Sequence, residues 1–160
     1  MRVGGHLHRD PASQGPPDAG PERSGLMDAR LRAQVRDRAG GRCEYCRIHK
    51  DDDPFFTFPI DHVIAQQHGG ATTFDNLCLS CFRCNAHKGP NLASVDPVTA
   101  ITAQLFHRRR GSWDEHFQWD GPVLVGNTPT GRATMRCLAI NHPDAVILRE
   151  LLIAEERFPG

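Results

Sequence analysis

The chain has no surplus of charge of either sign, no long apolar run and only one tyrosine. Its 19 Lys and Arg residues balance 19 Asp and Glu residues among 160, so composition gives no global signal for nucleic acid, and such a function must depend on local charge. No apolar segment approaches the length of a membrane span. The N-terminus lacks the apolar region of a secretory signal. We therefore expect a cytoplasmic protein with no membrane partner, in which thiols stay reduced.

Turn residues and apolar periodicity divide the chain into three parts. A stretch rich in proline, glycine and charge predicts a disordered leader over residues 1–25. Helical spacing after it, ended by Gly40 and Gly41, and later aromatic and β-branched runs predict an α+β domain over residues 26–96. Residues 97–160 are expected to form an extension, a β-hairpin and two helices, that packs on this domain.

Local patterns place the elements within these parts. We expect strands in 55–65 and 77–80, and a short helix after Cys84. Residues 23–50 carry eight basic against three acidic side chains. This local surplus is equally typical of a solvated helix face and of a surface that faces phosphates.

Two CxxC pairs, Cys43 with Cys46 and Cys81 with Cys84, are separated by 34 residues. Two such pairs supply the four thiolates that a structural Zn²⁺ ion prefers, and this interpretation is favoured over the alternatives. One alternative is a redox protein, which would use a single CxxC in a βαβ setting that the sequence lacks. Cys78 and Cys137 lie in apolar runs and are expected to be buried thiols.

Three further segments, "PIDHVIAQQHGG", "TFDNL" and "CFRCNAHKG", follow one another in the order of a known motif. Framed by the CxxC pairs, they resemble the HNH endonuclease family over about residues 26–96, and the tail resembles an extension of some bacterial members. The resemblance implies a zinc-stapled ββα-metal core. It also implies that Asn76 orients the imidazole of His62, and that cleavage leaves 5′-phosphate and 3′-hydroxyl ends.

The residue types suit phosphodiester hydrolysis, most readily of DNA. A neutral imidazole near physiological pH, here His62, can act as general base for a water. Asp61 and Asn85 offer hard oxygen ligands to a catalytic Mg²⁺ or Mn²⁺ ion, with His87 either a third ligand or a surface histidine. Candidates for phosphate contacts are Lys88, Arg108, Arg109 and Arg110, and a solvated loop competes for the three arginines.

A rival hypothesis is a non-catalytic zinc module that binds nucleic acid or protein on the same scaffold. The combination of Asp61, His62 and Asn85 argues against it, whereas the zero net charge favours it slightly. The sequence specifies neither the target, nor the biological pathway, nor the oligomeric state.

Overall fold

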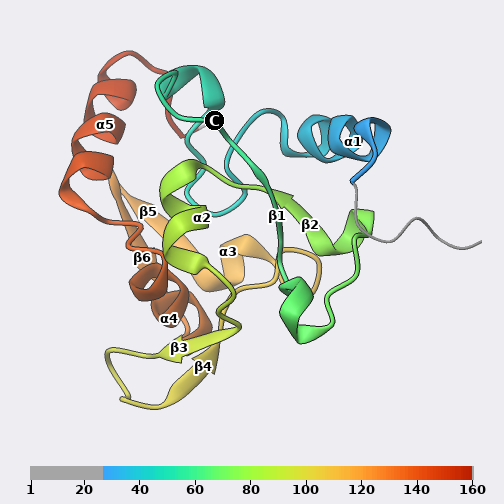
Figure 1. Cartoon of the computed structure of the whole chain (residues 1–160). Coiled ribbons are helices and arrows are strands. Elements are labelled where there is room, and N and C mark those ends of the chain that lie inside the picture. The colour runs from blue at the N-terminus through green and yellow to red at the C-terminus, as the bar shows by residue number, and fades with distance from the viewer. Residues whose placement is uncertain (1–26, 160) are drawn as a thin grey trace, which may run out of the picture.

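The computed structural model describes residues 27–159, and the predicted leader over residues 1–25 lies outside them. This part of the chain is α+β, as predicted, and it combines helices with two-stranded antiparallel sheets (Figure 1). The helices are α1 (Ala29–Ala39), α2 (Phe82–Lys88), α3 (Trp113–His116), α4 (Pro129–Cys137) and α5 (Pro143–Ala154). The paired strands are β1 (Ile60–His62) with β2 (Leu77–Leu79), β3 (Ala93–Val95) with β4 (Thr102–Gln104), and β5 (Phe117–Asp120) with β6 (Val123–Gly126). Short 3₁₀ helices lie at Lys50–Asp52, Gln66–His68 and Phe74–Asn76.

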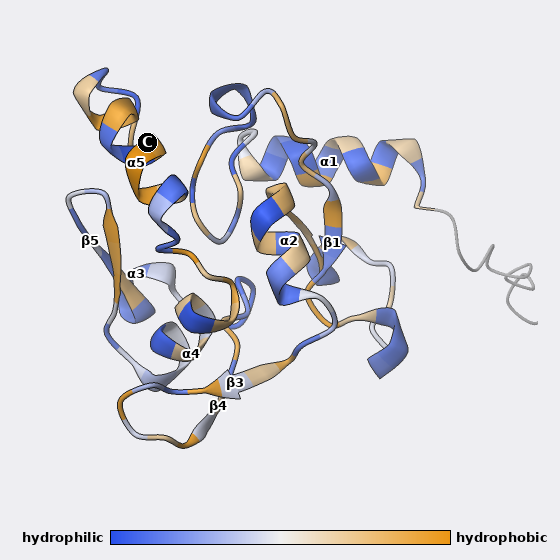
Figure 2. Ribbon diagram, turned by 60° about the vertical axis from the view of Figure 1, so that its left-hand side comes forward, coloured by the Kyte–Doolittle hydropathy of each residue, from blue (hydrophilic) through white to orange (hydrophobic). Residues whose placement is uncertain are grey.

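Helix α1 carries start and stop signals. The carboxylate of Asp28 accepts a hydrogen bond from the backbone N–H of Arg30 at 2.6 Å and caps the first turn. Gly40 ends the helix with a left-handed φ of 58°, which glycine adopts without a steric penalty. Only Val35 and Ala39 of the helix are buried, and Figure 2 shows the rest as mostly hydrophilic.

Strands β1 and β2 and helix α2 form a ββα unit. The register pairs Asp61 with Cys78 and His62 with Leu77. Strand β1 is shorter than the predicted strand over 55–65, because Pro59 has no N–H for a ladder and interrupts the run before it. Helix α2 begins before Cys84 rather than after it, since the sulfur of Cys81 accepts the backbone N–H of Cys84 at 3.4 Å and caps the helix.

The predicted hairpin and two helices of the extension are present as β5–β6, α4 and α5. Proline stands in the first turn of both helices. The β3–β4 hairpin was not predicted. It is tied to α4 by a bidentate ion pair, in which Arg132 donates from Nε and Nη2 to Asp96 at 2.8 Å each.

One apolar cluster runs through both parts of the described chain. It contains the four CxxC cysteines together with Leu138, Ile140, Leu152 and Phe158 of the extension. Helix α5 is largely apolar in Figure 2, and the ring of Phe158 beyond it packs edge-on against Trp119 at 4.9 Å. No helix within residues 27–159 is long and apolar enough to cross a membrane.

Candidate metal centre and catalytic site

The four CxxC cysteines come together in the buried core. Their sulfur atoms all lie within 4.8 Å of one another, and the sulfurs of Cys46 and Cys81 are 3.7 Å apart. Four sulfurs in a tetrahedron around zinc, each at about 2.3 Å from the metal, would be about 3.8 Å from one another. The spacing of the thiols therefore fits a zinc ion.

The backbone of each CxxC pair is folded back on itself. In the first pair the N–H of Cys43 donates to the carbonyl of Ile48, and the N–H of Arg47 donates to the carbonyl of Cys43. Arg47 adopts a positive φ of 65° at this tight turn. The second pair lies at the first turn of α2, where Cys81 is the N-cap. Both pairs thus point their sulfurs inward from short, hydrogen-bonded turns.

Without a cation the four thiols cannot all ionise together. Burial opposes ionisation of Cys43, but hydrogen bonds from Cys46, Cys81 and Cys84 outweigh it and lower the pKa of Cys43 well below its usual value. The hydrogen bond with Cys43 is the main cause that raises the pKa of Cys46 and of Cys84. A divalent cation would stabilise all four as thiolates, so the chemistry of the donor set also fits zinc.

The two remaining cysteines lie outside this cluster. Cys78 is buried and donates a weak hydrogen bond to the hydroxyl of Tyr45 at 3.7 Å, and burial raises its pKa to about 12. Cys137 is only partly buried and accepts a hydrogen bond from the side-chain amide of Asn91 at 3.8 Å.

Asp61 and His62 lie at the end of β1, against the last turn of α2. The ammonium of Lys88 on α2 donates to the carbonyl of His62 at 3.0 Å and lies 3.4 Å from Oδ2 of Asp61. That oxygen is buried and accepts no hydrogen bond from the described residues. The Asp61 side chain as a whole is 20% exposed, so the carboxylate is held in place at the edge of the buried region.

The imidazole of His62 is held by Thr72, a residue that sequence reasoning missed. Nε2 of His62 and Oγ1 of Thr72 are 3.0 Å apart. Asn76, expected on the imidazole, binds backbone instead: its amide donates to the carbonyls of Ile64 and Ala71 and accepts from the N–H of Ile64, each at 2.9 Å. The loop hydroxyls of "GGATTFDN" were the available signal for this partner.

The loop that carries Thr72 is closed tightly against β1. A Cβ atom on Gly70 would lie 1.7 Å from the carbonyl oxygen of Ile64, so only glycine fits there. Gly69 beside it has a φ of 80°. The glycine pair thus lets the loop turn back, and the three bonds of Asn76 fix it in that position.

Asn85 and His87 differ in their placement on α2. Asn85 is half-buried, three residues before Lys88 and therefore on the same side of the helix. Its side-chain amide makes no hydrogen bond within residues 27–159. His87 is exposed, and at about 100° per residue its side chain points about 160° away from that of Asn85.

Residues 43–91 match the family model described as HNH endonuclease. This segment is similar to an HNH domain. It contains both CxxC pairs, the ββα unit and every predicted catalytic residue, and its match ends before β3. A comparison with curated proteins found no match, and a comparison with solved structures found none either. The family indicates nuclease activity on nucleic acid, and the four-cysteine cluster indicates a zinc-knuckle form of the domain.

Lys88 does not reach toward solvent, contrary to the prediction of a phosphate contact. Lys88 is 1% exposed. Its ammonium donates to the carbonyls of His62 and Gly89 and lies beside the carboxylate of Asp61. These contacts all lie within the protein. Lys88 therefore holds α2 against β1 and is not available for a phosphate contact.

Two of the three arginines predicted to contact phosphate are directed inward. Nη1 and Nη2 of Arg109 donate to the buried carboxylate of Glu44 at 2.6 and 3.2 Å, and Nη2 also donates to the carbonyl of Leu77 at 2.8 Å. Arg108 is half-buried, with Nε 3.9 Å from Glu44. Only Arg110 is exposed. Glu44, the carboxylate that pairs with Arg108 and Arg109, lies between the two cysteines of "CEYC". Its position inside a CxxC pair was the one indication in the sequence of a buried acid that needs a basic partner.

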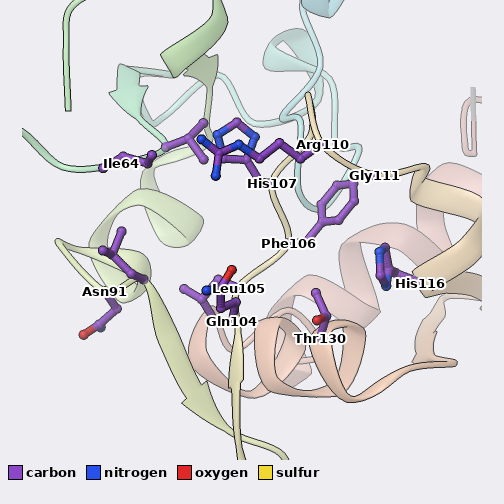
Figure 3. A pocket seen from close by; sticks show the side chains of 12 residues that line it. Ile64, Asn91, Gln104, Leu105, Phe106, His107, Arg110, Gly111, His116 and Thr130 are labelled. Atoms are coloured by element: carbon purple, nitrogen blue, oxygen red, sulfur yellow. The ribbon is translucent and has the colours of Figure 1, made fainter.

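Two neighbouring hollows adjoin the ββα unit, and both are lined by Ile64, His107 and Arg110. One continues along the loop at His68 and Gly70. The other runs toward the extension, and Figure 3 shows His107 and Arg110 beside Ile64 on one side of it, with Gln104 and Thr130 on the other. Arg110 therefore presents its charge at a recess directly beyond the strand that carries His62.

Proposed function

We propose that this protein is a divalent-metal-dependent endonuclease that hydrolyses phosphodiester bonds, with DNA as the favoured substrate and His62 as general base. The observation that carries the proposal is the contact between the ends of β1 and α2. Lys88 bridges Asp61 and the carbonyl of His62, and Asn85 lies one helical turn before it. Three side chains suited to the reaction thus belong to one rigid ββα unit.

Asp61 and Asn85 would hold the catalytic cation. Oδ2 of Asp61 is a buried anionic oxygen without a hydrogen-bond donor in the described chain, and the carbonyl of the Asn85 amide has no partner there either. A carboxylate with a neutral oxygen suits Mg²⁺ or Mn²⁺, which when bound acts as a Lewis acid on the phosphoryl group. His87 lies on another side of α2, so we leave it out of this ligand set.

His62 would take the proton from the attacking water. If the hydroxyl of Thr72 accepts from Nε2 of His62, the imidazole keeps its lone pair on Nδ1, where it can accept a proton. Thr72 is a positioning residue in this scheme. Asn76 acts one step further back, because it fixes the loop at Ile64 and Ala71, next to Thr72.

The recess at Arg110 is the favoured path for the nucleic-acid backbone. Arg110 is exposed and His107 and His68 also line the hollows, whereas Lys88 and Arg109 are occupied by Asp61 and Glu44. Phosphate contacts position a substrate without reading its sequence. Binding is therefore expected to be weak and dependent on salt concentration.

The non-catalytic zinc module is supported by one observation, the ammonium of Lys88 at 3.4 Å from Asp61. A cation already present beside the single carboxylate weakens the attraction for a metal ion. That hypothesis predicts binding to nucleic acid or protein without cleavage in any metal.

A nicking assay on supercoiled plasmid separates the two functions. With Mg²⁺ or Mn²⁺ we expect the wild type to nick, and His62→Ala to lose about 10²–10⁴-fold in rate, which is the usual contribution of a general base. His87→Ala is the matched control, an exposed histidine of the same domain, and should nick like the wild type. Zinc content should be equal in all three proteins. Equal nicking by wild type and His62→Ala, or no nicking in any metal, would refute the nuclease.

A further inference from the structure

Arg149 is a buried cation that has no anionic partner among residues 27–159. Its side chain lies on α5 and is 0% exposed. Nη2 donates to the carbonyl of Ile140 and to Oδ1 of Asn141, each at 3.1 Å. Nε and Nη1 are also buried and have no acceptor. A guanidinium withdrawn from water needs both a counter-charge and acceptors for all its N–H groups, and the described residues around Arg149 offer acceptors to Nη2 alone.

Two ion pairs tie the ends of helix α5 to segments that flank the CxxC pairs. Near its start, Asp144 lies 3.6 Å from Arg83, the neighbour of Cys84 on α2. Beyond its end, Arg157 pairs with Asp52, in the 3₁₀ helix that follows the first CxxC pair. Leu152, one turn after Arg149, belongs to the same apolar cluster as the four cysteines.

When ionised, Cys46 and Cys84 are the negative charges that act on Arg149. Burial lowers the pKa of Arg149, whereas the negative charge of Cys46 and Cys84 raises it. On its other side the guanidinium lies over the ring of Trp119, with its central carbon 5.2 Å from the ring centre. An aromatic face is a favourable neighbour for a cation, but it carries no charge to balance it.

A zinc ion bound by the four thiolates would supply the negative charge that Arg149 lacks. Zn²⁺ with four thiolates carries a net charge of about −2, and such a buried dianion is itself stabilised by a nearby cation and by N–H donors. We propose that Arg149 is the buried counter-cation of the zinc–thiolate centre and that its two free nitrogens, Nε and Nη1, face Cys46 and Cys84. The extension then completes a metal site whose ligands all lie between residues 43 and 84.

This inference goes beyond the proposed nuclease activity and depends only on the presence of zinc. The test compares wild type with Arg149→Met, which keeps most of the side-chain volume and removes charge and donors. Zinc affinity is measured by competition with a chromophoric chelator. Cobalt-substituted protein gives a second readout, the thiolate-to-Co²⁺ charge-transfer band. Arg132→Met is the matched control, because that arginine pairs with Asp96 away from the cysteines.

For Arg149→Met we expect zinc affinity about 10–100-fold below that of the wild type, the usual effect of removing a group that supports metal ligands. The charge-transfer band should move to lower energy, because thiolates without the cation give up an electron more easily. Arg132→Met should match the wild type in both measurements, even if its fold is less stable. Arg149→Lys, which keeps the charge but not the fork of donors, should lie between.

Three results would overturn the inference. One is a wild type that purifies and refolds without zinc. Another is Arg149→Met with unchanged affinity and an unshifted band, which would assign Arg149 to packing and to Ile140 and Asn141 alone. If Arg149→Met does not fold, Arg149→Lys is measured in its place. Zinc affinity and a charge-transfer band equal to those of the wild type in Arg149→Lys would then count against the proposal.

Discussion

Replacing Glu44 with glutamine should destabilise the zinc-loaded protein by about 3–5 kcal/mol, the usual cost of breaking a buried ion pair by removing one partner. Glu44 is 3% exposed, and its carboxylate has several partners. It accepts from Arg109 at 2.6 and 3.2 Å, from Nη2 of Arg38 at 3.4 Å, and from the N–H of Leu79 at 3.1 Å. Glutamine has nearly the same shape and can keep the bond to Leu79. It leaves three half-buried guanidinium groups, those of Arg38, Arg108 and Arg109, without the counter-charge that they share.

Urea unfolding of the zinc-loaded protein, followed by tryptophan fluorescence, measures this loss. For a chain of this length the corresponding fall in Tm is about 6–20 °C. Glu150→Gln, at an exposed position of α5, is the control and should change stability by no more than about 0.5 kcal/mol. In a double-mutant cycle, Glu44→Gln and Arg109→Met should show a coupling of about 1–3 kcal/mol. A loss below about 1 kcal/mol, or strict additivity with Arg109→Met, would mean that the Glu44 pair is solvated and that Arg109 is available to substrate.

Two more predictions concern the catalytic loop and the thiols. Thr72→Val removes the hydroxyl that holds His62. Under the proposed function it should lower kcat about tenfold with little change in KM, since a loss of about 1.4 kcal/mol in transition-state stabilisation corresponds to one factor of ten. Steady-state nicking rates measure this effect, and Thr72→Ser, which keeps the hydroxyl, should have the wild-type rate. In the zinc-loaded protein at pH 8, iodoacetamide should modify Cys137 and leave Cys78 intact, because the thiolate is the reactive form and burial raises the pKa of Cys78 to about 12. Mass spectrometry identifies the labelled cysteines. Chelation of zinc should make its four cysteine ligands reactive as well. Labelling of Cys78 before Cys137 would contradict the burial of Cys78.

The parts of the site that sequence could predict are those set by local spacing. A CxxC pair places two sulfurs on one tight turn wherever it occurs, so two pairs in one chain point to one zinc ion. The end of α1 at Gly40 and the β5–β6 hairpin also follow from residues that are adjacent in sequence. The positions of Asp61 and His62 at a strand end were implied by the family resemblance alone, because the strand predicted over residues 55–65 would have continued past them.

The partners of the polar side chains could not be predicted in this way. Lys88 ends a short helix, where a lysine is usually solvated, and only the packing of α2 on β1 buries it. Arg109 stands in a run of three arginines whose partner, Glu44, is 65 residues away. Arg149 had a local signal, because it lies four residues after Ala145 and three before Leu152 on the buried side of α5. A charged residue on such a stripe indicates a buried partner, although it does not name it.

The balance of charge around Asp61 has a consequence for the proposed reaction. Asp61 is the one carboxylate assigned to the catalytic cation, and the ammonium of Lys88 lies 3.4 Å from it. The two charges nearly cancel, so the protein donors alone attract a divalent cation only weakly. Mg²⁺ sites of this kind are completed by phosphate oxygens of the substrate. Under the proposed function, cation and nucleic acid therefore bind cooperatively, and Lys88 keeps the carboxylate in place until they arrive.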